Sequence, residues 1–383
     1  MKKATKNTQR LETIELPSPA AGTTITLDFY HYGEAGRGPK AYIHAALHAD
    51  EIPGLLVARK LIAMIADADS RGEIAGSILI APVANPLGLN QFFHGRLQGR
   101  FFTESGKNFN REFPEISGPI AQRVSEQLTN DAAHNVDLIR AAAREILAAT
   151  IPLDALGFLR HALFSRSVDA DYVLDLHCDD EANLYFYTLP ELWQDFRDLA
   201  AFMRCESVLL AEADPSIPFD EANSALWQRL AQRFPEHPIP LACKSTTLEL
   251  RGDRDVDDET AHRDALGIFQ YLQSRGVIAG DAPPVPELEC EATPFSGVGQ
   301  VIARHAGIVS FFREPGEVVS KGELLANLTP LEPFSPATEL IAPVSGVMYS
   351  RTRERYAYSG KVVCEVAGRA PLNENAGKSL LSN

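Results

Sequence analysis

The chain has 383 residues, more than one hydrophobic core usually serves, so we expect two domains. Its 45% hydrophobic and 23% charged residues are typical of a globular protein, and its net charge of −15 disfavours binding to nucleic acid. Five scattered cysteines without a Cys-x-x-Cys pair indicate a reducing compartment, the cytoplasm. The sequence contains neither a signal-peptide pattern nor an apolar run of about 18 residues, so we expect no membrane span.

The first part of the chain predicts strands followed by a helix. We expect short strands over residues 12–32 and an apolar strand over 41–47, which runs directly into His48. The segment 48–51 (HADE) leads to Pro53, a residue that suits the first turn of a helix. Ligands of open α/β sheets gather at the carboxyl ends of strands, and we expect His48 and Glu51 at such an edge.

The middle of the chain continues this alternation of strands and helices. Residues 88–114 form a long loop rich in Gly, Asn, Phe and Arg, and residues 118–166 are predicted as a mainly helical insertion. Asp257 is expected to cap a helix that runs to about Ser274. Further strands are predicted at 77–83, 171–176, 185–188, 207–211 and 246–250. Alternating strands and helices indicate a layered α/β sheet for residues 1–285.

The composition changes near residue 280. Residues 280–294 are rich in proline and acidic residues, which is typical of a linker. Residues 286–370 contain many short strand-like segments with Gly and Pro turns and no helical periodicity. We therefore predict a second, all-β domain over 286–370 and a polar tail over 371–383.

Two histidines and a glutamate form a candidate metal site. His48 and Glu51 lie three residues apart on a strand-to-helix turn, and His177 ends a second strand-like segment, VLDLH. Two imidazoles and a carboxylate are the ligands of an open catalytic zinc site, so we predict one Zn²⁺ per chain. A helix N-terminus with a favourable Glu is the structural alternative for the first pair. Asp175 is placed to hold an imidazole's second nitrogen, or to bind backbone amides.

Glu249 is the candidate general base. It ends the apolar segment TTLEL, and a carboxylate at the carboxyl end of a strand can accept a proton from a water at a metal. The alternative is a salt bridge from Glu249 to Arg251 or Arg254. Asp179 and Asp180 follow His177 closely and face either a cationic part of a substrate or, as a loop, solvent.

Asn110 and Arg111 are the candidate substrate-binding residues. They lie side by side in the long loop, and an amide next to a guanidinium fork is suited to hold a carboxylate. We therefore expect a small-molecule substrate that bears a carboxylate. A surface pairing of Arg111 with Glu112 is the alternative. Arg100 is a second candidate cation, and Arg96 is its rival.

Four motifs in this order resemble the succinylglutamate desuccinylase/aspartoacylase family of the zinc carboxypeptidase superfamily. They are LHADEIPG (47–54), NFNREFP (108–114), DLH (175–177) and TLELRG (247–252), and the resemblance spans about residues 40–275. It implies a mixed α/β sheet between helices. It also implies that His48, Glu51 and His177 bind zinc, Glu249 activates water, Asn110 and Arg111 grip the substrate's carboxylate, and Arg100 polarises the scissile carbonyl.

The second domain resembles the barrel-sandwich fold of lipoyl and biotinyl carrier domains. The matching stretches are REPGEVVSKGELLANL (313–328) and APVSGVMYS (342–350). The hairpin between them, 329–340, lacks the lysine that bears the cofactor in a carrier. We therefore predict a structural or lid domain without a covalent cofactor. Tyr349, Tyr356 and Tyr358 are its candidates for reaching the substrate.

The function implied by the ligands and the resemblance is a cytoplasmic, zinc-dependent amidohydrolase that acts on linear amides. Its substrate would be a small N-acyl amino acid or a related acylated amine. Two alternatives stay open: a metallocarboxypeptidase that acts on short peptides, and a non-catalytic zinc-binding protein that keeps the fold. We expect no nucleic-acid or membrane partner and leave a homo-oligomer open.

Overall fold

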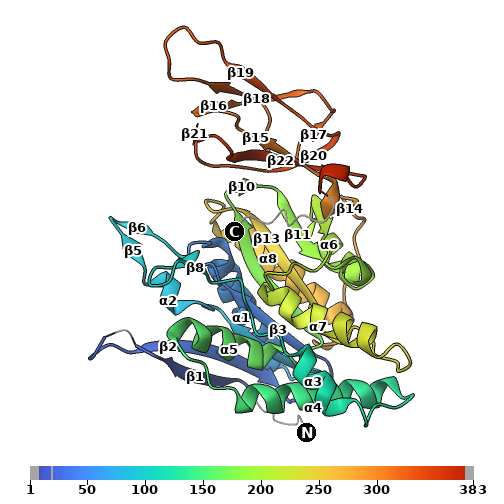
Figure 1. The fold of residues 1–383 in the computed structure, drawn as a ribbon. Helices are drawn as coiled ribbons and strands as arrows, with labels where there is room; N and C mark the ends of the chain where they lie inside the picture. The colour runs from blue at the N-terminus through green and yellow to red at the C-terminus, as the bar shows by residue number, and fades with distance from the viewer. Residues whose placement is uncertain (1–7, 19, 376–383) are drawn as a thin grey trace.

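The structure is a computed structural model that describes residues 8–18 and 20–375. A central mixed sheet organises its fold (Figure 1). Within these residues the sheet has nine strands. Their spatial order is β1 (Arg10–Leu16), β2 (Ile25–Gly33), β4 (Ser77–Ala81), β3 (Lys40–Ala45), β9 (Tyr172–Asp179), β13 (Lys244–Gly252), β11 (Leu184–Thr188), β12 (Ser207–Leu210) and β14 (Ala292–Pro294). Parallel and antiparallel pairs both occur, so the predicted mixed α/β sheet is confirmed.

The centre of the sheet is parallel. Strand β3 runs parallel to β4 on one side and to β9 on the other, and β9 is parallel to β13. The carboxyl ends of these strands therefore meet at one edge of the sheet. The register places Glu249 opposite His177 and Asp175 opposite His44.

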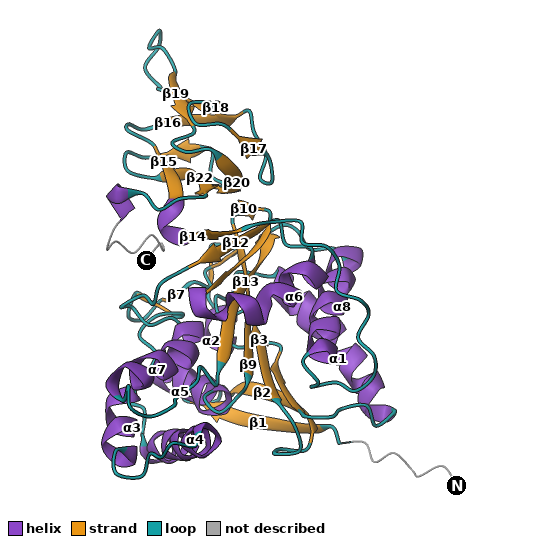
Figure 2. Ribbon diagram, turned by 90° about the vertical axis from the view of Figure 1, so that its right-hand side faces the viewer, coloured by secondary structure: helices purple, strands orange, loops and turns teal. Residues whose placement is uncertain are grey.

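Helices cover both faces of the sheet (Figure 2). One layer contains α1 (Pro53–Ser70), α6 (Trp193–Met203) and α8 (Asp258–Ser274), and the other contains α3 (Ser117–Val124), α4 (Ala132–Ala149), α5 (Ala155–Ser167) and α7 (Phe219–Arg233). Alternate strand residues point to opposite faces, so Ile43 packs in the core of the first layer and Tyr42 in that of the second.

Most local expectations are met by these elements. Pro53 starts α1, and the Asp257 carboxylate caps α8 by accepting hydrogen bonds from two backbone amides. The strand predicted at 41–47 ends at Ala45, and the next residue, Ala46, has a left-handed backbone with φ of 59°. The predicted helical segment 118–166 contains α3, α4 and α5. Helices α6 and α7 were not predicted.

Short elements fill the long loop and the connections. Helix α2 (Pro86–Leu89) precedes two hairpins, β5 (Phe92–Phe93) with β6 (Arg96–Leu97) and β7 (Phe101–Phe102) with β8 (Lys107–Asn108). Single 3₁₀ turns lie at Pro190–Leu192, Phe295–Gly297 and Asn373–Asn375. None of the helices in the described part of the chain is long and apolar enough to cross a membrane.

The C-terminal part is all β, as predicted, and we call residues 298–368 the β domain. Its strands are β15 (Val298–Ile302), β16 (Gly307–Phe311), β17 (Val318–Val319), β18 (Leu324–Thr329), β19 (Thr338–Ile341), β20 (Gly346–Arg351), β21 (Tyr356–Ala357) and β22 (Val362–Gly368). They form two sheets, and Val309, Leu325 and Val366 belong to their shared apolar core. The barrel-sandwich form itself stays a prediction.

The β domain is joined to the large sheet by strand pairing and charge. Strand β10 (Glu181–Ala182), just beyond β9, pairs with β20 and places Glu181 opposite Arg351. The Glu181 carboxylate lies 2.6 Å from Arg351 and 2.8 Å from Arg355. Strand β14 extends the large sheet beyond the predicted boundary at residue 285. The start of the predicted tail contacts the turn before β15, because Leu372 N donates a hydrogen bond to Ser296 O. The rest of the predicted tail, residues 376–383, lies outside the described residues.

Candidate metal centre and cavity

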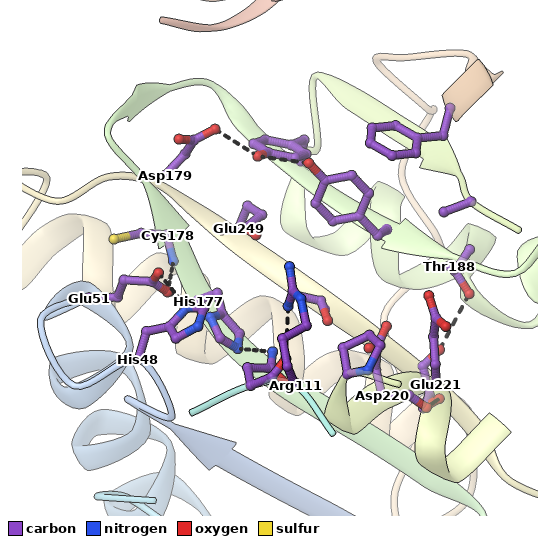
Figure 3. Close-up of a pocket in the computed structure, with 18 of the residues that line it drawn as sticks. His48, Glu51, Arg111, His177, Cys178, Asp179, Thr188, Asp220, Glu221 and Glu249 are labelled. Carbon is purple, nitrogen blue, oxygen red and sulfur yellow. Dashed lines mark hydrogen bonds and ion pairs between the residues drawn. The ribbon is translucent and has the colours of Figure 1, made fainter. Parts of the chain in front are cut away.

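The three predicted metal ligands lie together. The possible ligand atoms of His48, Glu51 and His177 are all within 4.8 Å of one another, and all three side chains are buried. Nδ1 of His48 lies 2.8 Å from Glu51 Oε1, and Nδ1 of His177 lies 2.6 Å from Glu51 Oε2 (Figure 3). The three residues come from the turn after β3 and from β9. This group can hold a metal ion through two imidazole nitrogens and a carboxylate.

The outer nitrogens of both imidazoles are held by oxygen atoms. Nε2 of His48 lies 2.8 Å from Asn108 Oδ1, and that oxygen also accepts the Asn110 backbone amide. Nε2 of His177 lies 2.9 Å from Asp175 Oδ1, so Asp175 lies where the sequence placed it. With a proton on each Nε2, both Nδ1 lone pairs face the same point, which is how histidine ligands are oriented around a metal.

Burial and charge set the protonation of these ligands. Burial, together with the Arg100 guanidinium, lowers the pKa of His48 to about 4. Burial also acts to lower the pKa of His177, but the Asp175 and Glu51 carboxylates outweigh it and raise that pKa well above its usual value. His48 is therefore neutral at pH 7, as a ligand must be, whereas His177 is charged and would lose its Nδ1 proton when a metal ion binds.

Glu249 lies beside the ligands on the adjacent strand (Figure 3). Its Oε2 is buried and accepts no hydrogen bond from any described residue. Arg251, its predicted alternative partner, instead forms a two-pronged salt bridge with Asp264 at 2.8 Å. Burial and the nearby Glu51 carboxylate raise the pKa of Glu249 well above its usual value.

Of the two rival arginines, Arg100 reaches the metal ligands. Its Nη1 lies 3.2 Å from Glu51 Oε1 and 3.3 Å from His48 Nδ1. Arg96 is exposed on the β5–β6 hairpin. The sequence could not separate them, because both belong to the same irregular loop.

Asn110 and Arg111 lie on the cavity wall, and the amide of Asn110 is partly engaged. Its Oδ1 accepts the Phe219 amide at 2.8 Å, and its Nδ2 lies 3.3 Å from His177 Nε2. The Asn110 carbonyl accepts Nη1 of Arg111 at 2.8 Å. Asn110 therefore helps to orient Arg111.

All seven predicted site residues line one cavity of about 350 Å³: His48, Glu51, Arg100, Asn110, Arg111, His177 and Glu249. The β domain closes part of it with Gln300, Val362 and Glu365. The tyrosines predicted for this role do not line it. Tyr349 is buried behind Tyr185, with ring centres 5.0 Å apart, and Tyr356 and Tyr358 are 55% and 63% exposed.

Several lining residues were not predicted. Asp220 and Glu221 lie at the start of α7, and burial with neighbouring carboxylates raises their pKa values to about 6 and about 9. Tyr185 and Tyr187 on β11 and Phe295 add aromatic rings. Pro218 before two acidic residues is a helix-start signal that could have located α7.

Comparison with protein families gives a match to an N-terminal segment of the chain. Residues 37–146 match the family model of the succinylglutamate desuccinylase/aspartoacylase catalytic domain. This segment contains His48, Glu51, Arg100, Asn110 and Arg111, whereas His177 and Glu249 lie beyond it. Among curated protein sequences, none matches this chain.

Solved structures share the fold over nearly the whole chain. A protein from Shewanella amazonensis SB2B, provisionally named a succinylglutamate desuccinylase/aspartoacylase family protein, is 26% identical with a TM-score of 0.82, covering 94% of this chain and 98% of that one. A similarly named protein from Shewanella frigidimarina NCIMB 400 has 24% identity, a TM-score of 0.84, and coverage of 95% and 98%.

A more distant structure is the product-bound ectoine utilization protein EutE (DoeB) from Ruegeria pomeroyi. It has 17% identity and a TM-score of 0.65, covering 95% of this chain and 99% of that one. At this identity the likeness extends to the fold alone. Together the family match and the shared fold confirm the resemblance read from the motifs: this chain resembles the succinylglutamate desuccinylase/aspartoacylase family, with the catalytic-domain match at residues 37–146.

Proposed function

We propose that the chain is a zinc-dependent amidohydrolase that removes the acyl group from a small N-acyl amino acid or a related acylated amine. The observation that carries this proposal is the convergence, in one cavity, of the three ligand residues with Glu249. The family match supports the reaction class. The five cysteines are all free, which supports a cytoplasmic location.

The donor set fits zinc. Two imidazoles and one carboxylate leave a coordination position open, and Asn108 and Asp175 hold the imidazoles by their outer nitrogens. Zinc held by His48, Glu51 and His177 would supply a Lewis acid and lower the pKa of a bound water to about 7.

Glu249 is the proposed general base and acid. Glu249 lines the cavity and its Oε2 has no hydrogen-bond partner among the described residues, so the carboxylate can accept a proton from the attacking water and return it to the leaving amine nitrogen. The ionised form of Glu249 is favoured once a divalent cation neutralises the charge of Glu51.

Two arginines have different proposed roles. Arg100, which contacts the ligand residues, donates to the carbonyl oxygen as negative charge develops on it. Arg111 binds the substrate's carboxylate with its guanidinium fork. Asn110 positions Arg111 through its carbonyl and can offer its side-chain amide hydrogens to the substrate.

The test is a substrate screen with the zinc-loaded chain. N-acetyl, N-succinyl and N-formyl amino acids are compared with dipeptides, and zinc is measured in the same samples. We expect about one zinc per chain and hydrolysis of an N-acyl amino acid that stops when a chelator removes the metal. Hydrolysis of dipeptides alone would favour the carboxypeptidase. Bound zinc with no hydrolysis would favour the non-catalytic protein.

A further inference from the structure

Two carboxylates from different parts of the chain face the same cavity as the metal ligands. Asp179 is the last residue of β9, two residues beyond His177. Glu365 lies on β22 of the β domain. Because β10 pairs with β20, the docking of the two sheets holds these carboxylates on one wall.

Both carboxylates are held by neutral donors. Asp179 accepts the Tyr185 hydroxyl at 2.9 Å and the backbone amide of Asp180 at 2.7 Å. Glu365 accepts Gln300 Nε2 at 2.9 Å and the Ser350 hydroxyl at 3.2 Å. Over residues 8–18 and 20–375, no lysine or arginine forms a salt bridge with either carboxylate. The charge of Arg100 also acts on Asp179, and a cation bound on this wall would add to it in compensating the two buried carboxylates.

The other carboxylates near the cavity lie beside groups that already have an assigned role. Asp220 and Glu221 at the start of α7 lie in the electrostatic field of Arg111. Glu51 contacts Arg100 at 3.2 Å. Asp180, the neighbour of Asp179, lies 3.7 Å from Arg353 and is directed to the domain interface. The wall of Asp179 and Glu365 is therefore the part of the cavity suited to a cation from the substrate.

Aromatic rings support the same conclusion. Tyr185 and Tyr187 pack edge to face with centres 5.3 Å apart, and Tyr187 packs in the same way against Phe295, also at 5.3 Å. All three residues line the cavity. Ring faces attract ammonium groups, and the attraction is strongest where water is excluded. Burial and the charge of Asp179 also raise the pKa of Glu365. A cation bound beside Glu365 would stabilise its charged form and so lower that pKa.

We propose that Asp179, Glu365 and these three rings form a subsite for an alkylammonium group of the substrate. The proposal rests on the proposed function and narrows it: the substrate carries a carboxylate for Arg111 and an ammonium group for this wall. The ammonium group can belong to the amine part, as in an N-acyl diamino acid. It can also belong to the acyl part, as in the free N-terminus of a short peptide, and hydrolysis of peptides alone would then favour the carboxypeptidase alternative.

Two matched pairs of compounds test the subsite and separate the two sources. Nα-acetyl-L-ornithine differs from Nα-acetyl-L-norvaline by one ammonium group on the amine part. L-alanyl-L-norvaline differs from N-propionyl-L-norvaline by one ammonium group on the acyl part. For one pair we expect the zinc-loaded protein to favour the charged member about tenfold or more in kcat/KM, the size of a charge-assisted contact.

Glu365→Gln removes the charge and keeps the shape, and it should reduce that preference about tenfold. Asp179→Asn is the second variant in case the first does not fold, and melting temperatures check both. Glu339→Gln is the matched control, because Glu339 is exposed on β19 of the same domain. The proposal is overturned if the wild type shows no preference in either pair, or if both variants keep it.

Failure of the subsite and failure of the proposed function give different results. Hydrolysis without an ammonium preference keeps the function and rejects the subsite. If neither these four compounds nor any N-acyl amino acid of the substrate screen is hydrolysed, the function fails, and the four compounds then serve as ligands that bind without turnover. Their dissociation constants are then measured by calorimetry on the wild type and on Glu365→Gln. The subsite is supported if the wild type binds the charged member of a pair about tenfold more tightly and the variant loses that preference, and it is rejected otherwise.

Discussion

The two ends of the cavity are built in different ways. At the metal end, His48, His177 and Glu249 lie near or just beyond the carboxyl ends of β3, β9 and β13, which are parallel neighbours in one sheet. The wall of Asp179 and Glu365, which we call the far wall, is built differently: Asp179 continues the strand of His177, but Glu365 comes from a second sheet that is brought there by the docking of the β domain. One register of hydrogen bonds therefore fixes the reactive groups, whereas the far wall depends on how two domains meet.

This difference separates the expected effects of substitution. Changes at the metal end should abolish metal binding or the chemical step for every substrate. Changes at the far wall and at its support should alter substrate preference or local stability. Four predictions follow from this contrast, from the largest effect to the smallest.

His177→Ala should have the largest effect. His177 supplies one of only three protein ligands, and substitutions of residues that merely hold a ligand already cost about 10–100-fold in metal affinity. We expect zinc affinity to fall by more than about 100-fold with the fold retained, as judged by metal analysis and circular dichroism. His262→Ala, on the exposed side of α8, is the control. Zinc near one per chain in His177→Ala would remove His177 from the site.

Glu249→Gln should leave the metal in place and slow the reaction. The amide keeps the shape of the side chain but cannot accept the proton, and general acid–base catalysis contributes about 10²–10⁴-fold. We expect kcat to fall by about that factor while zinc content and melting temperature persist. Glu126→Gln, exposed after α3, serves as the matched control. A near-normal kcat would end the candidacy of Glu249 as the base.

The metal end could be predicted from the sequence because its residues lie in short motifs at strand ends. His48 and Glu51 are three residues apart, and the DLH segment contains both His177 and the residue that holds it, Asp175. Local spacing and the carboxyl-end rule are then enough to bring the groups together.

The far wall could not be predicted in the same way. Glu365 is 186 residues beyond Asp179 in the sequence, and no motif links them. Tyr349 was a candidate because a tyrosine can reach a substrate with its hydroxyl. In β20, however, its side chain packs behind Tyr185 and does not line the cavity. Helices α6 and α7 were missed although Pro190 and Pro218 precede them, so the signal was present there.

Arg111→Ala should give an intermediate effect that depends on the substrate. Loss of a charge-assisted contact costs about 1.5–3 kcal/mol, which corresponds to about 10–100-fold in KM for an N-acyl amino acid. The primary amide of the same compound has no carboxylate for Arg111 to bind, so its KM should change little. The measurement is steady-state kinetics on both compounds. Arg96→Ala, a change at an exposed arginine, is the control. Equal losses on the acid and the amide would contradict the assigned role.

Glu181→Gln should give the smallest effect, and it tests how the far wall is supported. Glu181 binds Arg351 and Arg355 where β10 meets β20, and its side chain is 29% exposed. Partly exposed ion pairs contribute up to about 1 kcal/mol, so docking should weaken while each domain keeps its own core. Amide hydrogen exchange should then accelerate up to about fivefold in β20 and stay unchanged in β9, which is central in the large sheet.

Glu339→Gln, which carries the same substitution at an exposed site of the β domain, should leave both strands unaffected. Equal acceleration in β9 and β20 would mean that the large sheet and the β domain open as one unit. The far wall would then be as firmly fixed as the metal end, and the contrast between the two ends of the cavity would fail.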